Sequence, residues 1–170
     1  YARQDFAWTT ADGQTIRQPN RDPLLGRVAG ADGLKTGHTE EAGYGFTGSA
    51  EQNGRRLVMV LAGLDSYNGR AEESVRFMDW GFRAWSQRRV VAQGRQVETA
   101  EVQNGASGSV GLVAPRALSV TIPTGSSPQM QARVVYQGPI KAPIKAGDHI
   151  ADLVVSVPGM TPQTLPLVAD

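Results

Sequence analysis

The sequence has 170 residues, of which 40% are hydrophobic and 19% are charged, and its formal net charge is +1 at pH 7. This composition excludes collagen-like, coiled-coil and mainly disordered chains, and the balanced charge gives no overall field that would attract nucleic acid or an anionic membrane. The absence of cysteine excludes disulfides, thiolate metal sites and cysteine catalysis, and the two histidines lie too far apart in sequence to suggest a metal site.

The first part of the chain predicts β-strands. A turn at residues 11–14 separates short apolar runs, which indicates a hairpin. Three strand-like segments follow at 31–36, 43–51 and 56–64, and Asn53-Gly54 between the last two is a strong hairpin signal. Since the run from Leu57 to Leu64 is apolar on both faces, we expect a central strand that is covered on both sides.

A helix is predicted from residue 70 to 86, where the apolar period changes. One stripe contains Ala71, Val75, Met78, Phe82 and Trp85. Glu72 and Glu73 are expected in the first turn, where the helix dipole favours negative charge. The pattern indicates an amphipathic helix that lies on a sheet.

From residue 90 onward the sequence contains seven short, valine-rich runs separated by glycine, proline and asparagine. The runs are 90–91, 97–102, 110–114, 117–122, 132–136, 150–157 and 164–168. Their spacing predicts a small all-β sandwich. We therefore expect an α+β chain with two domains, residues 1–87 and 88–170, joined by a short linker near Gln87-Arg88.

The segment Lys35-Thr36-Gly37, preceded by Asp32-Gly33-Leu34 and followed by His38-Thr39, is the most informative motif. A lysine at a strand end places a positive charge beside a cleft, and the threonine adds a hydroxyl. The glycine lets a ligand backbone approach the strand closely. These groups suit an extended peptide carboxylate at a sheet edge, although Lys35 taken alone is better explained as a solvated lysine.

With its flanking residues, the motif resembles the Lys-Thr-Gly box of the serine D-alanyl-D-alanine carboxypeptidases, the low-molecular-mass penicillin-binding proteins. The similarity covers almost the whole chain and is looser after residue 86. The similar segments are 20–25, 42–44, 69–74, 80–82 and 118–123. The resemblance implies the C-terminal part of a transpeptidase/β-lactamase-like domain, with antiparallel strands and one helix, followed by the all-β domain.

The resemblance also implies roles for individual residues. Lys35 would assist proton movement and bind the charged end of the substrate, and the backbone N–H of His38 would donate to an oxyanion. Thr36, Gly37 and Arg70 would bind the substrate, with Thr36 and Arg70 facing its terminal carboxylate. We expect Lys35 and Arg70 to point into one groove. No metal or organic cofactor is implied.

One departure from the family is large, because no lysine in the chain has a serine three residues before it, so the Ser-x-x-Lys box is absent. Ser66-Tyr67-Asn68 spells Ser-x-Asn but follows the Lys-Thr-Gly box, and we interpret it as a helix cap. The acylating serine is expected in a missing N-terminal half. That half should cover the second face of residues 57–64, so the chain alone should be inactive.

By resemblance, the substrates are peptidoglycan stem peptides, and β-lactams acylate the enzyme. The expected location is the periplasm or the outer face of the cytoplasmic membrane. Peripheral membrane association is not encoded in these residues, and no nucleic-acid partner is expected. The alternative is a non-catalytic module that binds the cell wall or acts as a spacer.

Overall fold

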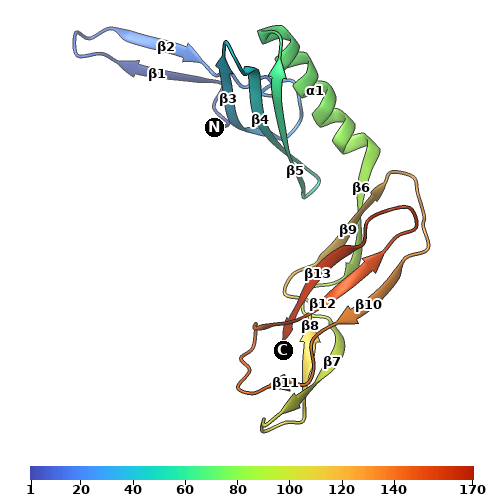
Figure 1. Cartoon of the computed structure of the whole chain (residues 1–170). Helices are drawn as coiled ribbons and strands as arrows, with labels where there is room; N and C mark the ends of the chain where they lie inside the picture. The colour runs from blue at the N-terminus through green and yellow to red at the C-terminus, as the bar shows by residue number, and fades with distance from the viewer. The chain divides into compact units, whose positions relative to one another are not determined.

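A computed structural model describes residues 1–170, which form one helix and thirteen strands (Figure 1). The chain divides into two compact units, Tyr1–Trp85 and Ser86–Asp170, just before the boundary expected at residue 87. The first unit contains both strands and the helix, and the second contains strands alone. The predicted α+β class with an all-β second part is confirmed.

The first unit contains a hairpin and a three-stranded antiparallel sheet. The hairpin consists of β1 (Asp5–Thr9) and β2 (Thr15–Pro19). The sheet has the order β3-β4-β5, with β3 at Ala31–Thr39, β4 at Gly43–Gln52 and β5 at Arg55–Leu64. The predicted strands and both hairpins are therefore present, and β3 is longer than expected.

The prediction that residues 57–64 form a central strand is wrong for this sheet, because β5 lies at its edge and β4 is central. Side chains on a strand alternate between the two faces. Met59 is buried, whereas its neighbours Val58 and Val60 are 60% and 67% exposed. The apolar character on both sides of β5 therefore corresponds to one covered face and one open face.

Helix α1 (Tyr67–Ala84) covers the face of the sheet on which Met59 lies. Met78 of the helix packs with Phe46, Ala50 and Met59 of the strands in a buried cluster. The helix begins earlier than predicted because the Ser66 side chain accepts a hydrogen bond from the Gly69 backbone N–H at 3.0 Å. This confirms the cap, and it leaves the first turn without an acidic residue, contrary to our expectation for Glu72 and Glu73.

The C-terminal end of α1 is fixed to the sheet by Arg55. Its guanidinium donates to the backbone carbonyls of Gly81 and Trp85 and lies 5.5 Å from the centre of the Phe82 ring. These bonds satisfy carbonyls that a helix end leaves free. The helix ends at Ala84, two residues before the predicted end at residue 86, and β6 (Trp85–Val91) follows without a loop. The linker expected at Gln87-Arg88 therefore lies inside a strand.

The second unit is built from two sheets. A six-stranded sheet has the order β10-β12-β13-β8-β7-β11, and β6 pairs with β9. The bounds are β7 Gln96–Gln103, β8 Ser109–Val113, β9 Leu118–Pro123, β10 Gln131–Val135, β11 Ile140–Lys141, β12 His149–Ser156 and β13 Gln163–Ala169. All seven predicted runs are strands, and the short β11 is the one that the sequence did not indicate.

Burial alternates along β9 and β12, as expected for strands that cover a core on one face. Leu118, Val120 and Ile122 of β9 pack with Leu153 and Val155 of β12. The Gln163 side chain bonds the backbone N–H and carbonyl of Thr121, both at 2.9 Å, and so connects β13 with β9. The core of the second unit therefore lies between its strands.

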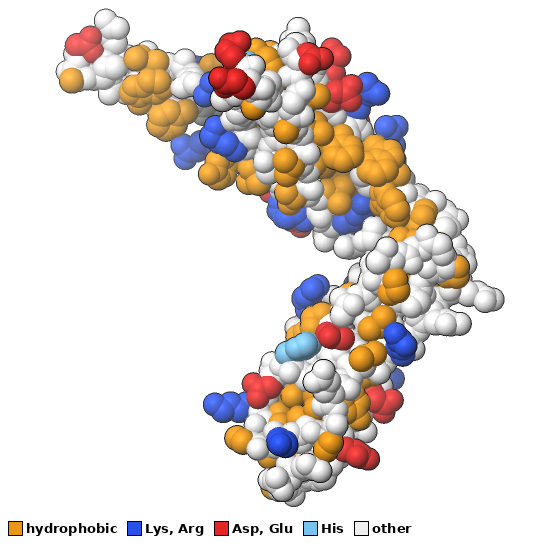
Figure 2. All heavy atoms as spheres, in the orientation of Figure 1, with side chains coloured by type: hydrophobic (Ala, Val, Ile, Leu, Met, Phe, Trp, Pro, Cys, Tyr) orange, Lys and Arg blue, Asp and Glu red, His pale blue; other side chains and the backbone are white.

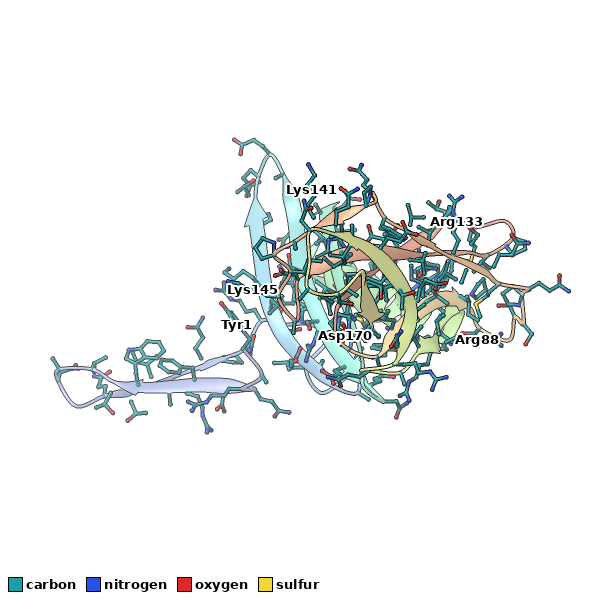
Figure 3. The ribbon with its side chains drawn as sticks, turned by 90° about the horizontal axis from the view of Figure 1, so that it is seen from below. Tyr1, Arg88, Arg133, Lys141, Lys145 and Asp170 are labelled. Atoms are coloured by element: carbon teal, nitrogen blue, oxygen red, sulfur yellow. The ribbon has the colours of Figure 1, made fainter.

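The lysines of the second unit lie at its surface. Lys141 belongs to β11 and Lys145 to the turn that precedes β12, and both are exposed (Figure 3). No helix here combines the length and the apolar composition needed to cross a membrane.

Candidate functional site

The Lys-Thr-Gly motif lies on β3, an edge strand of the three-stranded sheet (Figure 1). Its residues pair with β4 on one side: Lys35 with Thr47, Thr36 with Phe46, Gly37 with Gly45 and His38 with Tyr44. The other side of β3 has no partner in this sheet. An edge strand presents unpaired N–H and C=O groups, so an extended peptide can align with it.

The pairing register shows which face each side chain occupies. Phe46 is buried with Met78 of α1, so its face is the one that the helix covers. Thr36 pairs with Phe46 and therefore lies on the same face, as does His38 two residues later. Lys35 lies on the opposite, open face, beside Thr47 and across from Val60.

Arg70 reaches β3 from the helix side. It lies in the first turn of α1, is 4% exposed, and approaches the Gly37 carbonyl with one guanidinium nitrogen at 3.5 Å. Its guanidinium carbon is 5.6 Å from the centre of the Tyr44 ring and 4.9 Å from that of Tyr67. The structure thus brings Arg70, Gly37 and Thr36 together on one side of β3.

The expectation that Lys35 and Arg70 point into one groove is wrong. Lys35 is exposed on the open face, where its Nζ donates to the backbone carbonyl of Thr36 at 2.6 Å. Arg70 is on the helix-covered face. The alternation of side chains along β3 separates the two cations while leaving both beside the same strand edge.

His38 stacks on Tyr44, with the ring centres 4.0 Å apart. Both rings border an open hollow that includes Glu40, Glu41 and Asp65. The imidazole contacts this aromatic neighbour and has no hydrogen-bonded carboxylate. Three acidic side chains line this hollow, so the hollow itself does not favour an anion.

Sequence reasoning missed the two tyrosines that contact Arg70. Tyr44 was noted only as part of a family-like segment, and Tyr67 only as the middle residue of Ser-x-Asn. Tyr67 lies three residues before Arg70, the spacing at which helical side chains are neighbours, so this contact could have been found once the helix start was known. The contact with Tyr44 depends on the position of α1 on the sheet, which the sequence does not give.

Comparison with known families covers nearly the whole chain. Residues 85–170 match the model described as penicillin-binding protein 5, C-terminal domain. Residues 1–66 match the model described as D-alanyl-D-alanine carboxypeptidase. The carboxypeptidase segment lies in the first unit and contains the Lys-Thr-Gly motif, and the C-terminal-domain segment corresponds to the second unit.

Individual relatives agree with these families. The D-alanyl-D-alanine carboxypeptidase DacA of Haemophilus influenzae is 34% identical over 162 residues, which are 94% of this chain and 40% of the relative. DacC of Escherichia coli is 34% identical over 155 residues, covering 90% of this chain and 39% of the relative. The chain therefore spans about two fifths of the length of the relatives that it matches.

Solved structures show the same fold. The crystal structure of penicillin binding protein 5 from Haemophilus influenzae has a TM-score of 0.75 at 32% identity, over 99% of this chain and 48% of that one. For a peptidoglycan synthesis regulatory factor (PBP3) from Streptococcus pneumoniae the TM-score is 0.73 at 24% identity, over 99% and 50%, which supports the fold alone. The chain belongs to the penicillin-binding protein 5 family of D-alanyl-D-alanine carboxypeptidases and corresponds to a C-terminal portion of such a protein.

Proposed function

We propose that this chain works as part of a serine-type D-alanyl-D-alanine carboxypeptidase whose nucleophile lies in a segment outside residues 1–170. The observation that carries the proposal is the Lys-Thr-Gly motif on the open edge of β3, with Arg70 beside Gly37. Membership of the family supports it. The substrates would be peptidoglycan stem peptides that end in D-Ala-D-Ala, and the site of action would be the periplasm or the outer face of the cytoplasmic membrane.

In the reaction, the serine hydroxyl attacks the carbonyl of the penultimate D-alanine. The C–N bond to the terminal D-alanine breaks, its nitrogen takes up the proton that the serine loses, and an acyl-serine ester remains. Water then hydrolyses the ester and regenerates the serine. A β-lactam would acylate the same serine through its strained ring amide, whose nitrogen stays attached to the acyl group.

The residues of this chain would bind and polarise the substrate. The peptide would lie along the free edge of β3, and the absence of a side chain at Gly37 would allow the close approach. Thr36 and Arg70, which share a face, would bind the terminal carboxylate. The His38 backbone N–H would donate to the developing oxyanion, and Lys35 would assist proton movement from the open face.

Labelling with a fluorescent penicillin tests the proposal in the full-length enzyme that contains these residues. Lys35→Ala should slow acylation by roughly two to three orders of magnitude, the usual effect of removing a group that stabilises the transition state. Lys145→Ala removes an exposed lysine of the second unit and is the matched control, which should label at the parental rate. Parental labelling of Lys35→Ala would contradict the assignment of Lys35.

A second outcome concerns the alternative, a non-catalytic module that binds the cell wall or acts as a spacer. In that case the full-length parent would sediment with purified peptidoglycan and take up no penicillin. Labelling of the isolated 170-residue chain would also contradict the proposal, because no serine here has a lysine at the required spacing.

A further inference from the structure

Arg70 is a buried cation with few hydrogen bonds. The residue is 4% exposed, its Nε is buried without a partner, and the one hydrogen bond of its side chain is the 3.5 Å contact to the Gly37 carbonyl. None of the ion pairs in the structure includes it. Burial of a charge normally requires a paired carboxylate, so other groups must hold this guanidinium in place.

Two aromatic rings lie against the Arg70 guanidinium. The guanidinium carbon of Arg70 lies over the Tyr67 ring at 4.9 Å and over the Tyr44 ring at 5.6 Å. Both distances are within the range of cation–π attraction, which strengthens when the cation is desolvated. The contacts use the ring faces, so the hydroxyl groups of the tyrosines are not needed for them.

The two rings come from different elements. Tyr67 precedes Arg70 by three residues in α1, whereas Tyr44 belongs to β4 and stacks on His38 of β3 at 4.0 Å. The helical ring therefore fixes the arginine relative to its own helix, and the stacked pair fixes it relative to the motif strand. A flexible side chain held at both points keeps its planar donors beside Gly37 at little further cost in entropy.

We propose that Tyr44 and Tyr67 are positioning residues that hold the Arg70 guanidinium, through their ring faces, in the orientation needed to bind the substrate carboxylate. This inference rests on the proposed function for the carboxylate, but the ring contacts themselves do not. An arginine positioned in advance contributes to substrate binding throughout the reaction. Loss of either ring should therefore raise KM more than it lowers kcat.

The test uses the full-length enzyme with two D-Ala-D-Ala peptides, one ending in the free carboxylate and one in the amide. Tyr67→Leu and Tyr44→Leu should each raise KM for the carboxylate peptide by about tenfold, whereas the Phe variants should stay within about twofold of the parent. For the amide peptide, which gives Arg70 no anion to bind, the Leu variants should match the parent. Equal loss on both peptides would show a general structural defect and would overturn the proposal.

A spectroscopic measurement separates this inference from the proposed function. The ring currents of the tyrosines should shift the Arg70 Nε–Hε NMR resonance, identified by its loss in Arg70→Lys. The shift should persist in the Phe variants and become clearly smaller in each Leu variant, which keeps one of the two rings. If it does so while the parent treats both peptides alike, the positioning is correct and the carboxylate assignment fails. An unchanged resonance in Tyr67→Leu and Tyr44→Leu contradicts the positioning itself.

Phe82→Leu is the matched control. Phe82 packs under Arg55 at 5.5 Å in the same unit, so this variant also removes an arginine–aromatic contact and perturbs the core. It should lower stability without moving the Arg70 resonance or the ratio of KM values for the two peptides. A change in that ratio equal to the change in Tyr67→Leu would assign the effect to loss of stability.

Discussion

The two units of the chain bury their apolar residues to different degrees although they are of equal length. The second unit has a core of eleven buried hydrophobic residues, whereas the corresponding cluster of the first unit has six. All the large hydrophobic residues that remain exposed, except Val135, belong to the first unit. Figure 2 shows such side chains gathered along the β1–β2 hairpin, where Phe6 and Trp8 stack on each other.

The second unit covers its own apolar side chains, whereas the first unit leaves part of its apolar surface uncovered. In the second unit, alternating strands enclose the apolar side chains between themselves, so the unit needs no further cover. In the first unit, α1 covers one face of the sheet and leaves Val58 and Val60 open on the other. Apolar area of this kind usually marks a contact with another polypeptide segment. We expect the second unit to unfold independently and at the higher temperature.

The largest expected effect is in the core of the second unit. Leu118 is fully buried, so Leu118→Ala should lower the free energy of unfolding of this unit by about 3 kcal/mol through lost burial and the cavity that remains. Thermal unfolding followed by calorimetry should show a shift of the second unit's transition alone. A shift of both transitions would show that the two units unfold as one.

A smaller loss is expected where α1 begins. Ser66→Ala removes the acceptor for the Gly69 N–H and should lower the stability of the first unit by about 1 kcal/mol. Ser66→Asp keeps an acceptor at this position and is the control. Chemical denaturation followed by circular dichroism measures both, and equal stability of the Ala and Asp variants would argue against the cap.

The open face of β5 should respond differently from the core. Val60→Thr changes a residue that is 67% exposed, so the free energy of unfolding should change by less than about 0.5 kcal/mol. Self-association of the chain, measured by analytical ultracentrifugation, should decrease because an apolar contact surface is reduced. Met59→Thr, at the neighbouring buried position, should be strongly destabilising. Similar stability losses for both variants would remove the distinction between the faces.

The smallest effect concerns Asp22. Burial raises the pKa of this carboxyl, and the charge of Asp32 adds to the shift, against hydrogen bonds from the backbone of Leu24 and Leu25. A raised pKa means that the folded state favours the protonated form, so Asp22 contributes stability below its ordinary pKa and loses that contribution as the pH rises through the folded pKa. Asp22→Asn should therefore stabilise the first unit at pH 7.

The Asn variant keeps an oxygen that can accept from the Leu24 N–H, as Asp22 does at 2.8 Å. Its advantage should fade as the pH falls through the raised folded pKa of Asp22 and should be lost below about 4, the ordinary pKa of aspartate, where the side chain is protonated in both states. Denaturation curves for parent and variant at pH 7 and pH 3 measure the difference. A constant advantage at both pH values would show that charge burial is not its cause.

Local sequence patterns predicted most of the elements. Asn53-Gly54 marked the β4–β5 hairpin, and the valine-rich runs marked the strands of the second unit, because turns and alternation are properties of neighbouring residues. The cap at Ser66 was recognised, but the helix start was placed at residue 70, three residues too late, because the apolar stripe that marked the helix begins only at Ala71. The edge position of β5 was missed because strand order is a non-local property of the chain.

For the candidate site, too, local sequence identified the residues but not their arrangement in space. The motif Lys35-Thr36-Gly37 and Arg70 could be recognised from their flanking residues, but their arrangement could not. The separation of Lys35 from Arg70 follows from pairing between β3 and β4, and the contact between Arg70 and Tyr44 follows from how α1 lies on the sheet. Both are tertiary features that no spacing in the sequence encodes.

The free edge of β3 could pair with another protein chain as well as with a peptide substrate. A strand that can pair with a substrate can in principle pair with the same strand of another molecule and so begin aggregation. Here the exposed part of the strand carries a lysine at position 35 and a glycine at position 37, a charge and a weak strand former. Under the proposed function a short peptide would align with this edge, while the charge and the weak strand former at positions 35 and 37 disfavour stacking of many chains along it.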